Sequence, residues 1–166
     1  FGVFFAGLYG TTLGYTHAGL FYTISAVSMI IIRMISKHFM DTVPAIKTMT
    51  GAVACGILCC LMLLAAPYGE PVFLASGIFY GLATGISLPL NQSVAVKNTP
   101  PERWGAANAL FLLANDIGIG FASVIWGVIN DSFGFQTSIV CVIVCLIASY
   151  ASAWIVYPAR DKRWRH

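Results

Sequence analysis

One ionisable side chain lies deep inside an apolar stretch of the sequence. Asp116 stands 13 residues after Arg103, so a continuous helix places it about 19 Å further along the axis. A lone carboxylate in an apolar medium is costly unless it is paired, solvated or protonated. Two interpretations are open. Asp116 titrates or contacts a substrate, or it makes a structural hydrogen bond through Asn115 or a hydroxyl of a neighbouring helix.

Polar residues also follow one face of the stretch from 71 to 96. The row consists of Ser76, Tyr80, Thr84, Ser87 and Asn91. Steps of four, four, three and four residues keep the whole row on one side of a helix. Side chains that bond their own backbone explain a row of this length poorly. We therefore expect it to line a polar cavity, with such backbone bonding as the alternative.

Small residues run beside the polar row. They are Gly77, Gly81 and Gly85, one helical turn apart. Glycines at this spacing let two backbones approach closely, which drives helix association in lipid. We expect this helix to pack tightly on one neighbour, and Gly120 to serve as a further packing position.

The candidate substrate-binding residues come from the stretches 71–96 and 100–129. They are Tyr80, Thr84, Asn91, Asn108, Asn115 and Asp116. Asp116 is also the candidate for proton coupling. No basic residue is expected beside it, because every Lys and Arg lies near the end of an apolar run or in the tail.

Other reactive residue types form no pattern that indicates an enzyme or a metal site. His17, His38 and His166 lie at the edges of apolar runs or in the tail, and the five cysteines lie inside apolar runs without a CxxC pair. The sequence contains no HExxH or GxSxG motif and no paired carboxylates. We therefore expect no catalytic residues, no metal and no cofactor.

The composition excludes an ordinary soluble domain. Of 166 residues, 58% are hydrophobic and 9% are charged, whereas globular domains carry about 25% charged residues. Basic patches are too scarce for nucleic-acid binding. The long apolar runs do not alternate with polar residues, which indicates an all-α integral membrane protein.

The elements that must position these residues are five apolar spans and the end of a sixth. The expected spans are 1–13, 18–36, 45–66, 71–96, 100–129 and 135–157. Together they form one transmembrane bundle over residues 1–158, followed by a basic tail at 159–166. Because the chain begins with Phe1, we interpret it as a fragment whose first helix is truncated and whose N-terminal part is missing.

The basic residues predict the orientation of the spans. Lys and Arg flank the links near residues 37–44 and 97–100 and fill the tail, and the other links have none. The positive-inside rule places these two links and the C-terminus in the cytoplasm. A further local signal, Thr99-x-x-Glu102 with Pro100, predicts a capping box at the start of the span 100–129.

Several blocks of the sequence resemble a known transporter family. They are Gly77-Ile-Phe-Tyr-Gly-Leu-Ala-Thr-Gly, Pro89-Leu-Asn-Gln, Thr99-Pro-Pro-Glu-Arg-Trp-Gly-Ala-Ala-Asn-Ala and Leu113-Ala-Asn-Asp-Ile-Gly-Ile-Gly. They are similar to the tenth span, the next cytoplasmic link and the eleventh span of efflux-type members of the major facilitator superfamily. The whole chain is similar to the part from the end of span seven to span twelve.

The resemblance implies alternating access, in which two six-helix halves rock about a site at the membrane midplane. It implies that the chain works with the missing N-terminal half of the same transporter. The family's cytoplasmic loop motif is partly present as Arg33 and Asp41, which the resemblance makes a gating loop. An ordinary anchored loop is the alternative, because Lys37 and Thr42 depart from the motif.

The function expected from these observations is proton-coupled efflux of a small molecule by a secondary transporter. The alternatives are symport-type uptake of a small metabolite and a non-transporting membrane assembly module. The expected partners are the small-molecule substrate, the lipid bilayer and the N-terminal half. The expected location is the inner (plasma) membrane.

Overall fold

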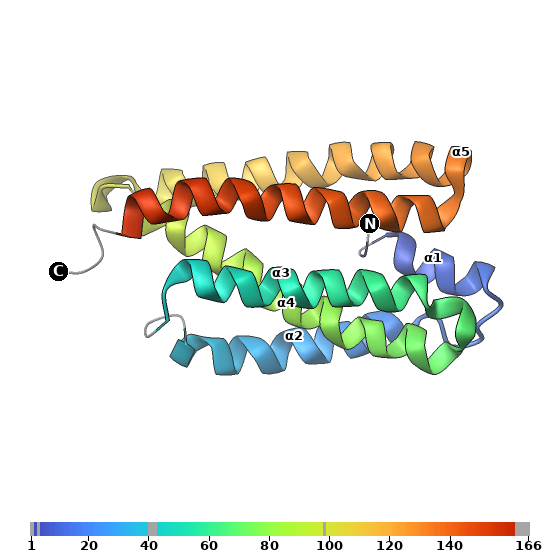
Figure 1. Ribbon diagram of the computed structural model, residues 1–166. Coiled ribbons are helices and arrows are strands. Elements are labelled where there is room, and N and C mark those ends of the chain that lie inside the picture. Colours follow the sequence, from blue (N-terminus) through green and yellow to red (C-terminus); the bar gives the residue numbers. More distant parts are fainter. Residues whose placement is uncertain (1, 3, 40–42, 98, 162–166) are drawn as a thin grey trace.

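Apolar helices make up most of the computed structural model, which describes residues 2, 4–39, 43–97 and 99–161. The helices are α1 (Phe5–Thr12), α2 (Leu20–Phe39), α3 (Ala45–Leu64), α4 (Glu70–Lys97) and α5 (Trp104–Asp161). Two short 3-10 turns, η1 (Ala66–Tyr68) and η2 (Pro101–Arg103), precede α4 and α5. The helices run back and forth along one bundle (Figure 1). The described residues contain no strand, which confirms the expected all-α fold.

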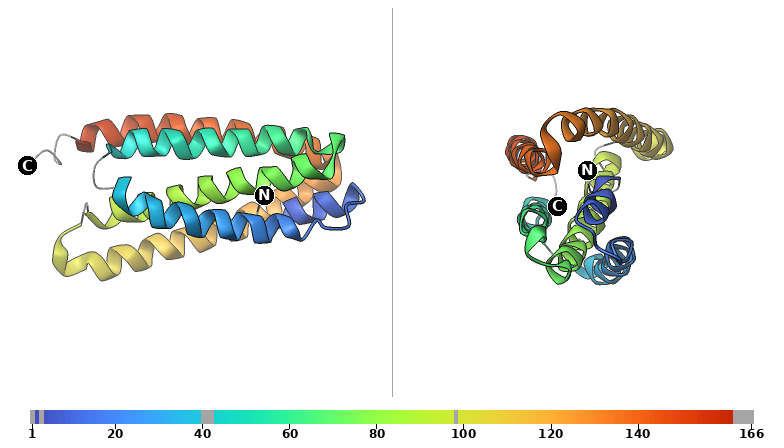
Figure 2. Two further views of the ribbon diagram at one scale, coloured as in Figure 1. Left: turned by 90° about the horizontal axis from the view of Figure 1, so that it is seen from below. Right: turned by 90° about the vertical axis from the view of Figure 1, so that its right-hand side faces the viewer.

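The longest helix reverses direction at a single glycine. Gly134 in α5 has φ 80° and ψ 170°, a conformation that residues with a Cβ atom rarely adopt. The arm 104–133 and the arm 135–161 are antiparallel, and they spread apart away from this turn (Figure 2). The chain therefore reverses at Gly134, between the two helical arms. The first arm continues to Phe133, beyond the expected end at residue 129.

The glycine row of α4 lies directly against α2. A Cβ atom on Gly77 would lie 2.9 Å from the carbonyl oxygen of Phe21, and one on Gly81 would lie 2.8 Å from Cβ of Ser28. One on Gly85 would lie 3.3 Å from Cα of Met29. The first two distances are too short for real atoms. The absence of side chains along this row is therefore what allows the two helices to approach so closely.

Aromatic side chains fill the bundle near the end where α1, α3 and α4 meet. Phe21 and Phe73 are fully buried, and their ring centroids lie 5.3 Å apart. Tyr15 lies beside them and donates a hydrogen bond from its hydroxyl to the carbonyl oxygen of Ala66 at 2.5 Å. At the surface of the same end, the backbone N–H of His17 donates to Glu70 at 3.1 Å. These contacts join the α1–α2 link to the start of α4.

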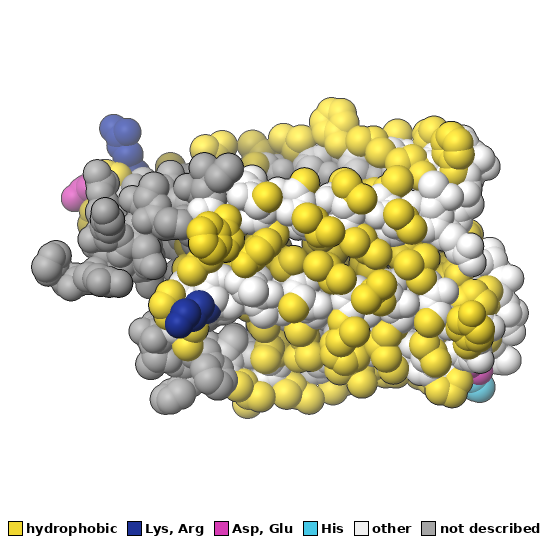
Figure 3. All heavy atoms as spheres, viewed as in Figure 1, with side chains coloured by type: hydrophobic (Ala, Val, Ile, Leu, Met, Phe, Trp, Pro, Cys, Tyr) yellow, Lys and Arg dark blue, Asp and Glu magenta, His cyan; other side chains and the backbone are white. Residues whose placement is uncertain are grey.

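Among the described residues, charged side chains other than Asp116 lie near the two ends of the bundle. On the face shown in Figure 3, basic side chains and an acidic one lie at one end, His and an acidic side chain lie at the other, and hydrophobic side chains cover much of the surface between them. Large apolar residues are exposed along α2 and α5, among them Met34 at 77% and Phe121 at 70%. A water-facing surface of this kind would be unfavourable, so it indicates contact with lipid or protein.

Three helical segments among the described residues have the length and composition to cross a membrane. They are 45–64, 70–96 and 101–154, and the last contains the reversal at Gly134. Leu20–Ser36 of α2 is a shorter apolar helix. The segments 45–64 and 70–96 correspond to expected spans, and 101–154 contains two of them.

The expected capping box is wrong. Thr99 donates its hydroxyl hydrogen to the carbonyl oxygen of Ala95 at 3.2 Å, and its backbone N–H bonds to Val96 at 3.0 Å. Pro100 instead precedes the 3-10 turn η2, which has no side-chain cap. The Thr-x-x-Glu spacing therefore matches the motif, but here Thr99 closes the end of α4 and does not start α5.

Candidate functional site

A cavity of about 350 Å³ lies between α3, α4 and the second arm of α5. We call it the pocket. Its walls are Met49, Ala52, Val53, Gly56, Cys59, Cys60 and Leu63 of α3, Tyr80, Ala83, Thr84, Ser87 and Asn91 of α4, Val142, Leu146 and Ser149 of α5, and Gly2. This volume lies near the lower end of the range of small-molecule sites, roughly 300–1,000 Å³.

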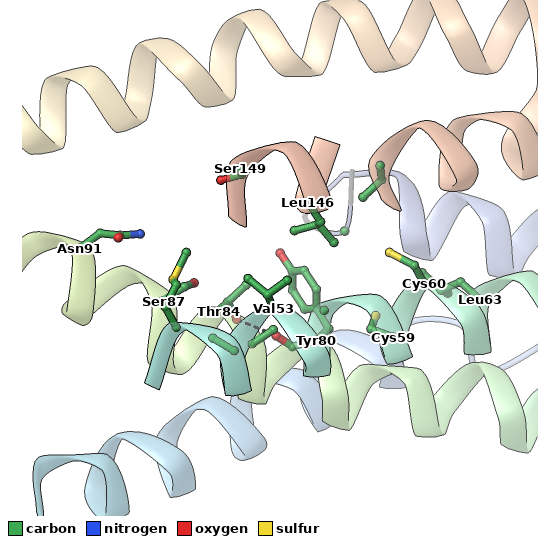
Figure 4. A pocket seen from close by; sticks show the side chains of 16 residues that line it. Val53, Cys59, Cys60, Leu63, Tyr80, Thr84, Ser87, Asn91, Leu146 and Ser149 are labelled. Atoms are coloured by element: carbon green, nitrogen blue, oxygen red, sulfur yellow. Dashed lines mark hydrogen bonds between the residues drawn. The ribbon is translucent and has the colours of Figure 1, made fainter. Parts of the chain in front are cut away.

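The polar wall of the pocket is the row on α4. Tyr80, Thr84, Ser87 and Asn91 all line it, and their side chains follow one side of α4 in Figure 4. Ser76 does not take part. It is fully buried and donates to the carbonyl oxygen of Phe73 at 2.6 Å. The row therefore divides into one packing residue and four residues at the pocket.

The hydroxyl groups of the polar wall differ in whether they already donate a hydrogen bond within the protein. Thr84 donates its proton to the carbonyl oxygen of Tyr80 at 2.8 Å, so it offers the pocket mainly an acceptor. The hydroxyl of Tyr80 has no hydrogen-bond partner among the described residues, and its ring stands out from α4 toward Leu146 (Figure 4). Ser87 also has no side-chain partner within the described part of the chain. Tyr80 and Ser87 are therefore the available hydroxyl donors.

The walls opposite α4 are largely apolar. α3 contributes aliphatic and sulfur-containing side chains, and Leu146 of α5 closes the space above Tyr80 (Figure 4). A Cβ atom on Gly56 would lie 3.4 Å from the side chain of Leu146, so α3 and α5 approach each other there. The pocket thus has one polar edge and apolar walls facing it.

The other predicted site residues lie outside the pocket. The side-chain oxygen of Asn108 accepts a hydrogen bond from the side-chain nitrogen of Gln92, which joins the first arm of α5 to α4. Asn115 is half-buried and Asp116 is exposed on the same arm. The structure therefore brings Tyr80, Thr84 and Asn91 together and places Asn108, Asn115 and Asp116 along a different helix surface.

The remaining predicted positions have separate surroundings. A Cβ atom on Gly120 would meet no atom of the described chain within 4 Å, whereas Gly77, Gly81 and Gly85 lie against α2. Arg33 is exposed near the end of α2. Asp41, its predicted gating partner, lies outside the described residues.

Sequence reasoning left most of the pocket residues out of its candidate set, among them Ser87, Ser149 and Cys60. Ser87 was in the polar row, and its spacing was a sufficient signal to include it. Ser149 and Cys60 stand in apolar runs with no local pattern. They line the pocket only because α3 and α5 meet across from α4.

The comparisons with known proteins identify the family. The model of the Major Facilitator Superfamily matches residues 1–166. The chain belongs to the major facilitator superfamily. It is 26% identical over 162 residues to the staphylopine export protein of Staphylococcus aureus (strain Mu50 / ATCC 700699), covering 93% of this chain and 41% of that relative. No solved structure matches the chain.

Membership of the superfamily indicates the general class of protein to which the chain belongs. It is a multi-pass membrane protein of a transporter family, not of an enzyme family. The chain spans about two-fifths of the length of the curated relative that it matches. The apolar surface of the bundle agrees with this class, because hydrocarbon surrounds such helices in a membrane.

Proposed function

We propose that the chain forms the C-terminal half of a secondary active transporter that exports a small molecule by alternating access with proton coupling. The observation that carries the proposal is the polar row on α4, which lies in a bundle of apolar helices of membrane-spanning length. Polar residues inside such a bundle are costly in lipid and mark substrate pathways.

Export is the direction that we propose. The relative at 26% identity is named an export protein. The family model and the enclosed polar row are common to exporters and importers. The proposed direction therefore rests on this similarity, and a transport measurement decides it.

The proposed partner is the N-terminal half of the same transporter. The first arm of α5 carries Asn115 and Asp116, and most of its residues are exposed. A polar and small-residue helix surface of this kind suits a protein neighbour better than lipid. We propose that this arm faces the second half, with the inner membrane as the location and the C-terminus in the cytoplasm.

A vesicle experiment tests the proposed function. Everted membrane vesicles that contain the complete protein are energised by respiration, and the fluorescence of a pH-sensitive acridine dye reports the proton gradient. A panel of small compounds, both charged and uncharged, is then added. Partial collapse of the gradient with at least one compound supports proton-coupled transport, and no response to any compound contradicts it.

The same vesicles test the role of Asp116. We expect Asp116→Asn to reduce the collapse of the proton gradient at least tenfold, since an amide cannot carry the proton. Asp131→Asn is the matched control, because Asp131 is exposed next to the reversal at Gly134. Transport whose pH dependence is unchanged in Asp116→Asn removes Asp116 from proton coupling.

A further inference from the structure

We propose that the contact between α1 and the reversal end of α5 is metastable, and that it separates during transport so that Tyr9 and Asn130 become hydrated. The proposal deepens the proposed alternating access, because it names the place where one end of this bundle opens. Its role in transport rests on the proposed function, whereas the separation itself is measured without transport.

Three buried polar atoms at this contact have no hydrogen-bond partner among the described residues. They are the hydroxyl oxygen of Tyr9 and the side-chain atoms Nδ2 and Oδ1 of Asn130. Tyr9 is 4% exposed and Asn130 is 9% exposed. The three atoms have almost no accessible surface, so neither water nor a neighbouring segment reaches them unless the helices move. Additional protein around the bundle would cover these atoms further and could not uncover them.

The two residues belong to the contact between α1 and the first arm of α5. A Cβ atom on Gly127 would lie 3.9 Å from Cζ of Phe5, so the two helices meet there. Tyr9 follows Phe5 by four residues and Asn130 follows Gly127 by three, which places both about one helical turn nearer the reversal. The ring of Tyr9 also packs on Phe135, with ring centroids 5.1 Å apart. Figures 1 and 2 show α1 beside this end of α5.

Other buried polar side chains of the bundle do have partners. The hydroxyl groups of Ser25, Ser76 and Ser138 are buried, and each donates to a carbonyl oxygen of its own helix. Most buried polar groups in proteins are paired in this way. An unpaired group disfavours the arrangement that buries it by roughly fivefold or more in the equilibrium. Separation of α1 from α5 exposes Tyr9 and Asn130 to water and removes this penalty.

The opposite end of the same arm has a paired polar contact. There the side-chain oxygen of Asn108 accepts a hydrogen bond from Gln92 of α4. The first arm of α5 is therefore joined to the bundle by a hydrogen bond at one end, and its buried amide at the other end is unpaired. This difference assigns the separation to the end near the reversal, which is the end away from the links expected in the cytoplasm.

Removal of the unpaired groups from the complete protein tests the proposal by thermal unfolding in detergent. We expect Asn130→Leu, which replaces the amide by an apolar group of similar size, to raise Tm by about 2 °C or more. Tyr9→Phe should also raise Tm. Asn108→Leu is the contrast, because it breaks the bond with Gln92, and its Tm should fall. Tyr68→Phe is the matched control and should leave Tm unchanged, since Tyr68 is 90% exposed.

Hydrogen–deuterium exchange of the complete protein in lipid nanodiscs measures the separation itself. Backbone amides in a helix exchange when the helix opens to water. We expect exchange over residues 5–12 to slow about threefold or more in Asn130→Leu, because the separated state loses its advantage. Residues 45–64 of α3 should keep the wild-type rate and serve as the internal reference.

Two results would overturn the proposal. A lower Tm of folded Asn130→Leu would show that the amide makes favourable hydrogen bonds, and unchanged exchange over residues 5–12 would show that the contact does not separate. If Asn130→Leu yields no folded protein, Tyr9→Phe decides by the same two measurements. Neither measurement needs a substrate, so the proton response in everted vesicles remains a separate test of transport.

Discussion

Gly134 shows how much one residue can decide in this bundle. It holds the reversal of α5 at φ 80°, although no atom lies within 4 Å of the place where a Cβ atom would stand. The requirement for glycine is therefore conformational and not steric. We expect Gly134→Ala to destabilise the protein by about 1–3 kcal/mol, measured as a lower Tm for unfolding in detergent.

A second glycine in α5 supplies the control for this prediction. Gly118 also has open space around it, but it lies within the helical first arm. Alanine favours a helix over glycine, by about 1 kcal/mol, so Gly118→Ala should leave Tm unchanged or raise it. Equal losses of Tm in the two variants would contradict the conformational explanation.

The polar row illustrates what residue spacing can and cannot predict. The steps between Tyr80, Thr84, Ser87 and Asn91 correctly place them on one side of α4, because helix geometry depends on spacing alone. Spacing does not predict that Ser76 packs inside the bundle, or that the Thr84 proton bonds to the backbone. Both depend on neighbouring helices and on side-chain rotamers, which a single sequence does not contain.

Between helices, the closest approach occurs where α2 and α4 meet at the glycine row. A Cβ atom on Gly81 would overlap the backbone of Ser25, and backbone atoms cannot move aside as a flexible side chain can. We expect Gly81→Ala to destabilise the protein by about 1–3 kcal/mol. Thermal unfolding of the purified protein in detergent, followed by circular dichroism, measures the effect.

Gly51 of α3 provides the matched comparison. It is also a helical glycine, and open space surrounds its Cβ position. Gly51→Ala should therefore keep the wild-type Tm or raise it. A similar fall of Tm in both variants would show that helix propensity, and not contact with α2, explains the result at Gly81.

Helix ends were less predictable from the sequence than helix positions. The Thr99 motif suggested a cap for α5, yet Thr99 bonds to α4 and a 3-10 turn intervenes. Likewise, α2 continues to Phe39, three residues beyond its expected end at Ser36. Ends depend on which of several possible partners a backbone group finds, whereas long apolar runs leave no alternative to a helix in lipid.

At the scale of the whole molecule, the two ends of the bundle should lie on opposite sides of the membrane. Arg33 and Arg103 lie at one end, and His17 and Asp131 belong to links at the other. In intact cells we expect a membrane-impermeant maleimide to label His17→Cys and Asp131→Cys. Arg33→Cys and Arg103→Cys should react only after the membrane is permeabilised.

Controls for the native thiols make this labelling interpretable. The five native cysteines lie in α3 and α5, so labelling of the unsubstituted protein gives the background. Labelling of Arg33→Cys in intact cells, with His17→Cys protected, would reverse the proposed orientation. The sequence supports this prediction because every Lys and Arg sits at one set of alternate links or in the tail.

The pocket could not be derived from the sequence. Its polar wall is local to α4, but the opposing walls come from residues 49–63 and 142–149, which no local pattern connects. Superfamily membership predicts a bundle of helices. Which small gaps remain between particular side chains depends on tertiary packing.

The seam at Gly77, Gly81 and Gly85 has a mechanical consequence. Two helices whose backbones are in contact cannot slide or tilt against each other without atomic overlap. We therefore expect α2 and α4 to move together as one rigid unit. The first arm of α5 is joined to α4 by the hydrogen bond from Gln92 to Asn108 and is otherwise widely exposed. In the proposed alternating-access cycle, we therefore expect movement within this chain at the contact between α4 and the first arm of α5, while the polar row of α4 keeps its arrangement.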